Sequence, residues 1–305
     1  MKGHAALFLA LNHDRELLYS RSFHMSKVRM MVTPYPRIPP TILSIGPIAI
    51  RWYSLMYLVG YVVGYRLVLR RVADGRARIT RSELDSLIWF LVAGMLIGAR
   101  VFYVLIYGRA DYATHPLEAL AVWRGGLSFH GAILGMATAI VIFARRHRIP
   151  ALDVTDLVAL CGTPGLFFGR IGNFINGELY GRPTDLPWAM VFPSDPSRLP
   201  RHPSQLYEAF AEGILLSALL WGIDYWRRAR GNAPRGLSTA VFLIGYAMIR
   251  FSLEFTRQPD PQLGFVVGAL SMGQLLSIIM LGCGVVLLGG IYLHRAPSSR
   301  ASSAS

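Results

Sequence analysis

The chain has 305 residues, 53% hydrophobic and only 16% charged, and its mean hydropathy is +0.41. Soluble domains carry about 25% charged residues, so this composition excludes an ordinary soluble protein and indicates a membrane protein. The net charge of +14 suggests nucleic-acid binding at first sight, but the arginines lie in short clusters between apolar runs. This pattern is typical of cytoplasmic loops in multi-pass proteins, and we expect no nucleic-acid partner.

The first 40 residues contain no sustained apolar span. The apolar run 5–11 is too short for a secretory signal peptide and is followed by Asn12, His13 and Asp14. We expect residues 1–40 to be a disordered extension and the Ser/Ala-rich residues 296–305 to be a disordered tail. Residues 41–295 are then a single transmembrane domain.

A bilayer core of about 30 Å needs roughly 20 apolar residues per helix. Two of the apolar segments are short and are expected to extend into 127–130 and 169–174. The sequence therefore predicts an all-α, polytopic membrane protein with about seven transmembrane helices. The predicted spans are 47–69, 84–107, 131–144, 154–168, 206–225, 237–256 and 268–293.

The loops predict the orientation of these spans. Five arginines lie in 70–81, three in 145–148 and four in 227–235, whereas the alternate loops are poorer in arginine. Because cytoplasmic loops are enriched in arginine and lysine, we expect the N-terminus outside and the C-terminus in the cytoplasm. The proline-rich stretch within 171–206 is then a structured extracytoplasmic segment.

Polar side chains gather at the predicted outer ends of six spans. This one-sided distribution favours an active site in the outer leaflet over scattered structural contacts. The residues concerned are Tyr53, Arg100, His130, Arg170, Asn173, Asn176, Glu178, Gln205, Tyr207, Glu208, Arg250 and Glu254.

Such a cluster suits recognition of a phosphodiester. Arginine presents a planar, permanently charged fork, so Arg170 and Arg250 are candidates to clamp one phosphate. Asn173 and Asn176 can add donors, and a neutral His130 can accept a proton. The sequence lacks the motifs of nucleotide hydrolases, serine esterases and zinc proteases, and its cysteines have no metal-ligand spacing.

Five of these residues also have simpler explanations. Arg250 and Glu254, spaced i,i+4, can form an ion pair within one helix. Arg100 can extend to the membrane interface, and Tyr53 can belong to the interfacial aromatic belt. His130 can be a hydrogen-bonded structural histidine.

Residues 169–181 read GRIGNFINGELYG, which closely resembles the signature of bacterial prolipoprotein diacylglyceryl transferases. Further blocks resemble the family in the same order, and together they cover about 46–273. They are RWYSLMY at 51–57, GLSFHG at 126–131, HPSQLYE at 202–208 and RFSLEFTRQPD at 250–260.

The resemblance implies a seven-helix enzyme of the bacterial inner membrane, surrounded by membrane lipids and using no metal or organic cofactor. Its substrates would be phosphatidylglycerol and the signal peptide of a prolipoprotein, at its lipobox cysteine. The diacylglyceryl group would pass to the cysteine sulfur as a thioether, with release of glycerol 1-phosphate.

Matched to the family motifs, the implied site residues are Tyr53, His130, Arg170, Asn173, Glu178, Gly181, Arg250 and Glu254. We expect Arg170 and Arg250 to stabilise the leaving phosphate and His130 to be the base, with Tyr53 also catalytic. Glu178 and Glu254 would orient the arginines, and Asn173 the head group. The substrate-binding set is completed by Asn176, Gly181, Arg100 and Gln205.

A transporter or flippase for an anionic lipid or solute is the alternative, because arginines facing a cavity suit that function too. The absence of an inverted repeat and the confinement of the polar residues to one half of the membrane argue against it.

Overall fold

The computed structural model describes residues 32–46, 48–75, 77–108, 112, 114–231, 234–258, 265–268 and 270–293. Among these residues, six apolar helices are long enough to cross a membrane, and a seventh, shorter apolar helix, α9, accompanies them. The protein is therefore a mainly helical, multi-pass membrane protein, as the sequence predicts.

Two of the six long helices contain wider, π-helical turns. Helix α3 (Arg81–Phe102) continues through the π-helix η1 (Tyr103–Tyr107), and α7 (Ser204–Glu208), the π-helix η4 (Ala209–Leu215) and α8 (Leu216–Ala229) form one continuous rod. The remaining apolar helices are α2 (Trp52–Ala73), α5 (Phe129–His147), α6 (Ala151–Asn176), α9 (Leu237–Leu253) and α10 (Met272–Leu293).

Local signals explain several helix ends. Thr80 and Glu83 form a capping box at the start of α3, and the Ser128 side chain accepts from the Gly131 amide at the start of α5. Helix α6 runs on to Asn176, where Gly177 adopts a left-handed φ of 68° and stops it. Arg170, Asn173 and Asn176 therefore lie inside the last two turns of α6, which ends two residues beyond the expected extension to 174.

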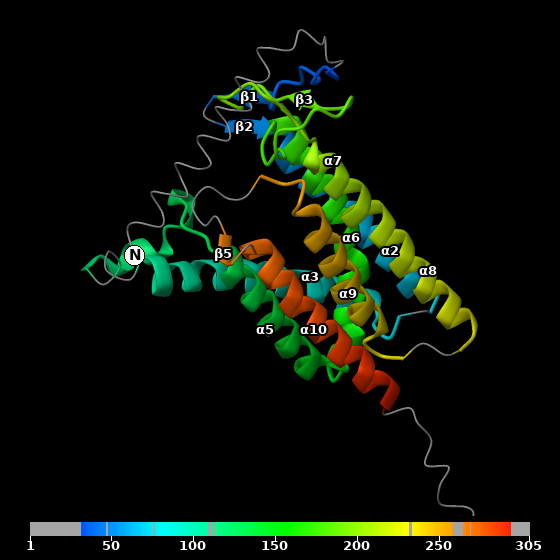
Figure 1. Cartoon of the computed structure of the whole chain (residues 1–305). Coiled ribbons are helices and arrows are strands. Elements are labelled where there is room, and N and C mark those ends of the chain that lie inside the picture. Colours follow the sequence, from blue (N-terminus) through cyan, green and yellow to red (C-terminus); the bar gives the residue numbers. More distant parts are fainter. Residues whose placement is uncertain are drawn as a thin grey trace, which may run out of the picture.

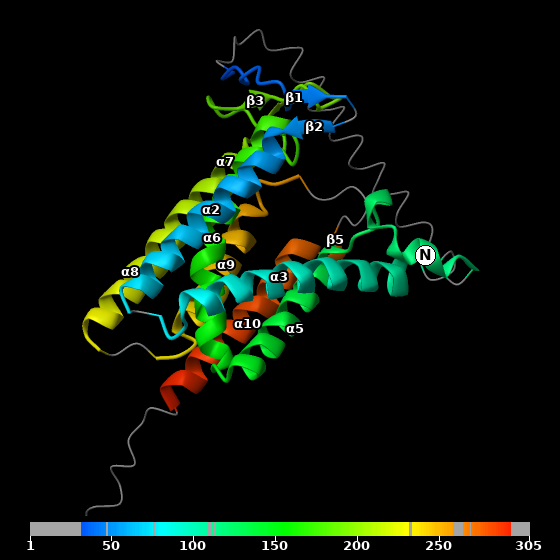
Figure 2. The ribbon, with the colours of Figure 1, turned by 180° about the vertical axis from the view of Figure 1, so that it is seen from behind.

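The helices form two groups that lean apart (Figures 1 and 2). One group contains α2, α6, α8 and α9, and the other is the α3–α5 hairpin with α10 alongside it. The groups approach each other at the ends of the helices opposite β1–β3 and diverge toward the strands. Helix α9 packs extensively against both α10 and α6, and so connects them.

Glycines bring α3 and α5 into backbone contact. A side chain at Gly94 would meet Ala139 and the Gly135 carbonyl, and one at Gly98 would meet the backbone of Gly131 and Gly135. Small residues four apart let membrane helices approach closely where apolar burial gives no driving force.

Short strands extend the helices at one end, which the all-α prediction did not include. Strand β1 (Thr41–Ile45) pairs with β2 (Ile48–Arg51) through a turn in which Gly46 has a φ of 58°. The first helix therefore starts at Trp52 instead of 47, because the isoleucine-rich run beside this turn favours strand. The other pairs are β3 (Met190–Val191) with β4 (Pro200–Arg201) and β5 (Phe265–Val267) with β6 (Leu270–Ser271).

The predicted disordered extension, 1–40, includes residues that the structure shows in contact with the rest of the protein. The Thr33 amide donates to the Ala189 carbonyl, and the Tyr35 hydroxyl donates to the Phe174 carbonyl at 2.6 Å. Aromatic packing of Tyr35 against Phe174 and Phe192 fixes this stretch on the segment that follows α6. Residues 1–31 and the predicted tail 296–305 lie outside the described part of the chain.

At the other end of the first group, buried acids tie the helices together. The Asp156 carboxylate of α6 accepts from the backbone amides of Gly236 and Thr239, both at 2.8 Å, and from the Thr239 hydroxyl. It thereby caps α9 from a neighbouring helix. Nearby, Arg71 of α2 pairs with Asp224 of α8 at 2.9 Å.

Candidate active site

Arg170 is held by two glutamates. Its Nε lies 2.8 Å from an oxygen of Glu208, and its Nη2 lies 3.2 Å from an oxygen of Glu212. Both carboxylates are fully buried on the α7–α8 rod, with at most 1% of each residue exposed. Because an unpaired buried charge is costly, the three groups stabilise one another inside the bundle.

Arg250, in the last turn of α9, pairs with Glu254 at 2.7 Å. The Ser271 hydroxyl at the start of α10 donates to the same carboxylate at 2.8 Å. A buried Nη1 of Arg250 has no hydrogen-bond partner among the described residues. The predicted i,i+4 ion pair is therefore present, and it leaves part of the guanidinium available to another acceptor.

The two arginines belong to one electrostatic cluster. Glu212 and Tyr246 each lie within Coulombic range of both Arg170 and Arg250. Arg257 joins from the chain after α9, with its Nη1 3.5 Å from the second oxygen of Glu208. We call these residues the arginine cluster: Arg170, Glu208, Glu212, Tyr246, Arg250, Glu254 and Arg257.

A second polar group adjoins the end of α6. The Asn173 carboxamide donates to Glu178 at 2.8 Å, and that of Asn176 donates to the same oxygen at 3.4 Å. The Tyr53 side chain of α2 interacts with Asn173 and Glu178, and Gln205 donates to the Glu178 carbonyl at 2.7 Å. Glu178 thus orients the two asparagines, and within the described contacts it does not hold an arginine as expected.

Gly181 brings three pieces of backbone together. Its amide donates to the His202 carbonyl at 2.9 Å, and it bridges to Arg257. A side chain at this position would collide with the Thr256 carbonyl and with His202. Only glycine permits this approach, which joins the segment after α6 to the chain that carries Arg257.

The segment between α6 and α7 has a buried ion pair of its own. Arg201 Nε lies 2.6 Å from the Asp195 carboxylate, which also accepts from the Ser197 hydroxyl at 2.8 Å. Burial alone would raise the pKa of Asp195, but these hydrogen bonds outweigh it and hold the pKa below its usual value. The segment is therefore a folded platform over the end of α6.

Arg100 lies apart from the arginine cluster. Its guanidinium donates to the carbonyls of Glu118 and Ala119, both at 2.7 Å, and of Gly125 and Gly126. These carbonyls belong to the loop that contains the 3₁₀ helices η2 (Pro116–Leu120) and η3 (Val122–Arg124). Four of the five N–H groups of Arg100 are thereby used to hold this loop.

His130 starts α5 on the other helix group. Its ring neighbours are Phe102 and Phe129, and the side chain is exposed. The contacts of the described residues do not join it to Arg170 or Arg250. The structure thus brings together Tyr53, Asn173, Asn176, Glu178 and Gln205 on one side and the arginines on the other, but not His130 or Arg100.

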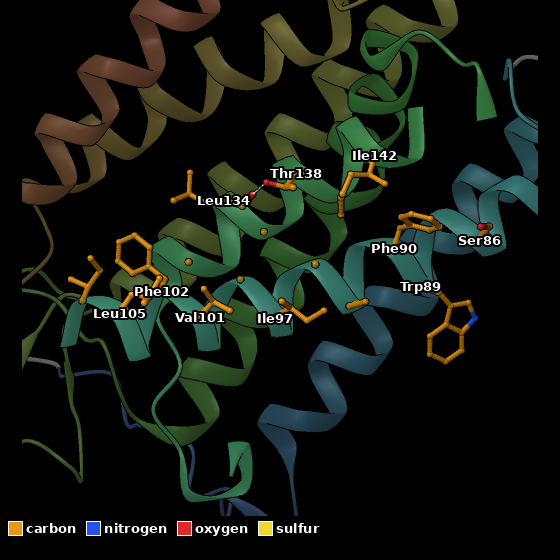
Figure 3. A pocket seen from close by; sticks show the side chains of 17 residues that line it. Ser86, Trp89, Phe90, Ile97, Val101, Phe102, Leu105, Leu134, Thr138 and Ile142 are labelled. Carbon is orange, nitrogen blue, oxygen red and sulfur yellow. Dashed lines mark hydrogen bonds between the residues drawn. The ribbon is translucent and has the colours of Figure 1, made fainter. Parts of the chain in front are cut away.

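A groove of about 740 Å³ runs along α3 and α5 (Figure 3). Its lining is apolar apart from Ser86 and Thr138, whose hydroxyl donates to the Leu134 carbonyl. The lining includes none of the arginine cluster. The groove therefore offers hydrocarbon contact without the groups needed for phosphate chemistry.

Comparison with known proteins shows the family to which the chain belongs. The family model described as prolipoprotein diacylglyceryl transferase matches residues 40–289. The chain belongs to the prolipoprotein diacylglyceryl transferase family. A relative from Bordetella bronchiseptica, named phosphatidylglycerol–prolipoprotein diacylglyceryl transferase, is 48% identical over 268 residues, which cover 87% of this chain and 99% of the relative.

Two further relatives in this transferase family carry the same name. One from Nitratidesulfovibrio vulgaris is 48% identical over 255 residues, covering 83% of this chain and 94% of the relative. One from Azospirillum brasilense is 46% identical over 260 residues, covering 85% and 96%.

Three cluster residues were missing from the site residues predicted for this transferase: Glu212, Tyr246 and Arg257. Glu208 was noted among the outer polar residues but was given no role. A usable signal was present, because Glu208 and Glu212 are two carboxylates four residues apart inside an apolar span. Acidic residues at such depth are rare and mark functional sites.

Proposed function

We propose that this protein transfers the diacylglyceryl group of phosphatidylglycerol to the lipobox cysteine of a prolipoprotein. The thiol sulfur forms a thioether with the glycerol carbon of the lipid, the carbon–oxygen bond to phosphate breaks, and glycerol 1-phosphate leaves. The observation that carries the proposal is the convergence of Arg170 and Arg250, from separate helices, in one buried cluster. Membership of the transferase family supports it.

The arginine cluster suits the demands of this reaction. The phosphodiester carries one negative charge and gains a second as the carbon–oxygen bond breaks. Donors that are already in place in a low-dielectric site stabilise such growing charge without reorganisation. The Nη1 of Arg250, which has no hydrogen-bond partner among the described residues, is one such donor. Asn173 and Asn176, oriented by Glu178, supply uncharged donors suited to the glycerol head group.

His130 is our candidate for the base that removes the thiol proton. A thiol has a pKa near 8.5, so its attack at neutral pH needs a base or a positive field. His130→Gln should lower the transfer rate by about 10²-fold or more, which is the usual contribution of a general base. It should leave binding of phosphatidylglycerol unchanged. A variant with the wild-type rate would remove His130 from the mechanism.

We further propose that the protein lies in the bacterial inner membrane with the arginine cluster toward the outer leaflet. The arginine-rich loops 70–81, 145–148 and 227–235 support this orientation. Cysteine labelling of single sites in these loops tests it, since an impermeant reagent should react only after the membrane is opened.

The activity is tested with purified protein in vesicles. Vesicles containing phosphatidylglycerol and a lipobox peptide should release glycerol 1-phosphate and yield a peptide heavier by the diacylglyceryl mass. Vesicles of phosphatidylcholine, or a peptide with serine in place of the cysteine, are the matched controls. Movement of labelled lipid between leaflets without release of glycerol 1-phosphate would overturn the proposal in favour of a transporter.

A further inference from the structure

Glu212 is the least exposed residue of the arginine cluster. The residue is fully buried and belongs to the π-helix η4. A side chain at the next residue, Gly213, would overlap Phe167, so η4 packs directly against α6. Wide π-helical turns occur frequently at functional sites.

The contacts of Glu212 are one-sided. Its Oε2 accepts from Nε and Nη2 of Arg170, at 3.3 and 3.2 Å, which is one edge of the guanidinium. Its Oε1 is buried and has no hydrogen-bond partner among the described residues. Glutamate therefore orients Arg170, leaves its Nη1 for another acceptor, and has one oxygen that a proton can occupy.

The charges around Glu212 nearly balance before any lipid binds. The facing groups are Arg170 on α6, Glu208 on α7, and Tyr246 and Arg250 on α9. Arg257 contacts Glu208, and Glu254 contacts Arg250. Within the described part of the cluster, three arginines thus face three glutamates.

A bound phosphodiester adds one negative charge to this balance. An uncompensated charge in a buried site is costly, so one carboxylate has to take up a proton. Glu208 contacts two arginines, and Glu254 has both Arg250 and the Ser271 hydroxyl. Of the three carboxylates, Glu212 alone contacts a single arginine and carries no second donor among the described contacts.

We propose that Glu212 is a positioning residue that holds Arg170 for the lipid phosphate and takes up one proton from solvent when the anionic lipid binds. The proposal rests on the transferase function above. The arginines of the cluster are already paired with glutamates. Protonation of Glu212 would offset the negative charge of the lipid phosphate and so allow the cluster to bind it.

Calorimetry measures this proton directly. Wild-type protein in detergent is titrated with short-chain phosphatidylglycerol at one pH in two buffers of different ionisation enthalpy. We expect uptake of about one proton per lipid in the wild type, because one added charge requires one compensating proton. Glu212→Gln, which imitates the protonated form, should bind the lipid with uptake near zero.

The matched control is Asp224→Asn, the same change on the same helical rod at the opposite end. It should keep the wild-type proton uptake. A Glu212→Gln variant with wild-type uptake, or a wild type that binds lipid without uptake, overturns the proposal.

Kinetics supply the second readout. In the wild type, KM for phosphatidylglycerol should rise with pH where Glu212 loses its proton, by up to about tenfold per pH unit. Glu212→Gln should abolish this slope, because a carboxamide does not titrate, whereas Glu212→Ala should also lower kcat because Arg170 loses its support. Unchanged KM slope in Glu212→Gln contradicts the proposal. Failure of the wild type to release glycerol 1-phosphate would instead contradict the function itself.

Discussion

The two ends of the helix group α2, α6, α8 and α9 both bury charge, but they use it differently. At one end, Asp156 accepts three hydrogen bonds from Gly236 and Thr239, two of them from backbone amides. At the other, Arg170 is held by side chains alone, and oxygens of Glu212 and Gln205 remain without partners among the described residues.

This difference distinguishes charged groups that only stabilise the fold from charged groups that can also bind a ligand. A carboxylate bound to backbone amides is fixed by the fold and gains nothing from a ligand. Side chains that contact only one another, with donors and acceptors to spare, can exchange partners when a ligand arrives. Burial of a charged residue therefore does not by itself indicate function. Unused hydrogen-bonding capacity alone does not indicate it either, because Nε and Nη1 of the buried Arg71 near Asp156 also lack partners among the described residues.

The largest effect is expected from Arg170→Ala and Arg250→Ala. Each should lower the transfer rate by about 10²- to 10³-fold, as loss of a preorganised donor to a growing negative charge does. The thermal unfolding temperature should fall as well, because each change leaves buried glutamates without their cation. Glycerol 1-phosphate release at matched protein levels measures the rate. Full activity in both variants would show that the arginine cluster only stabilises the fold, as Asp156 does.

Asp156→Ala should lower stability and leave turnover nearly unchanged. It leaves two amides and a hydroxyl unpaired at the start of α9, at a cost of about 3 kcal/mol in the free energy of unfolding. Turnover per folded molecule should stay near the wild-type value. Denaturant unfolding in detergent, together with the release assay, separates the two quantities. A loss of turnover without a loss of stability would contradict a purely structural role for Asp156.

Gly181→Ala should lower both the free energy of unfolding and the transfer rate, each by less than the changes above. The added methyl group meets the Thr256 carbonyl and His202, and such overpacking typically costs about 2 kcal/mol. Since Gly181 connects to the chain that carries Arg257, activity should fall as well. Gly162→Ala is the control, because a side chain there meets no atom within 4 Å.

The smallest effect concerns acid stability through Asp195. Its pKa is lowered in the folded state, so its contribution is present above the unfolded pKa of about 3.9 and is lost as the pH falls through the folded value. Asp195→Asn should therefore cost about 1 kcal/mol near neutral pH and progressively less below about pH 4. Unfolding temperatures measured from pH 7 to pH 3 test this. A constant difference across that range would contradict it.

Apolar length and motif order were sufficient to predict the membrane helices and the family. The start of α2 was not predictable this way, because a strand of isoleucines has the same hydropathy as a helix of isoleucines. Helix α6 ends at Asn176, two residues beyond the expected extension to 174, and its polar side chains are tolerated there because neighbouring helices provide partners.

The predicted site residues met with different outcomes. Sequence could place Arg170 and Arg250 on the same side and could pair Arg250 with Glu254 four residues later. It could not assign Glu208 and Glu212 to Arg170, because partners on other helices have no fixed spacing along the chain. Arg100 lies within the same predicted band of residues, yet its donors are taken by the loop carbonyls. Depth along a span is thus predictable, and the direction of a side chain is not. The roles of His130 and the remaining site residues stay predictions.

The glycine contacts between α3 and α5 constrain how His130 can approach the arginine cluster. Backbones that touch at Gly94, Gly98, Gly131 and Gly135 cannot slide past each other without collision, so α3 and α5 form one closely packed unit. Arg78 after α2 and Arg235 before α9 both pair with Asp153 in the first turn of α6, at 3.2 Å each, so one carboxylate ties three parts of the chain together at this end of the helices.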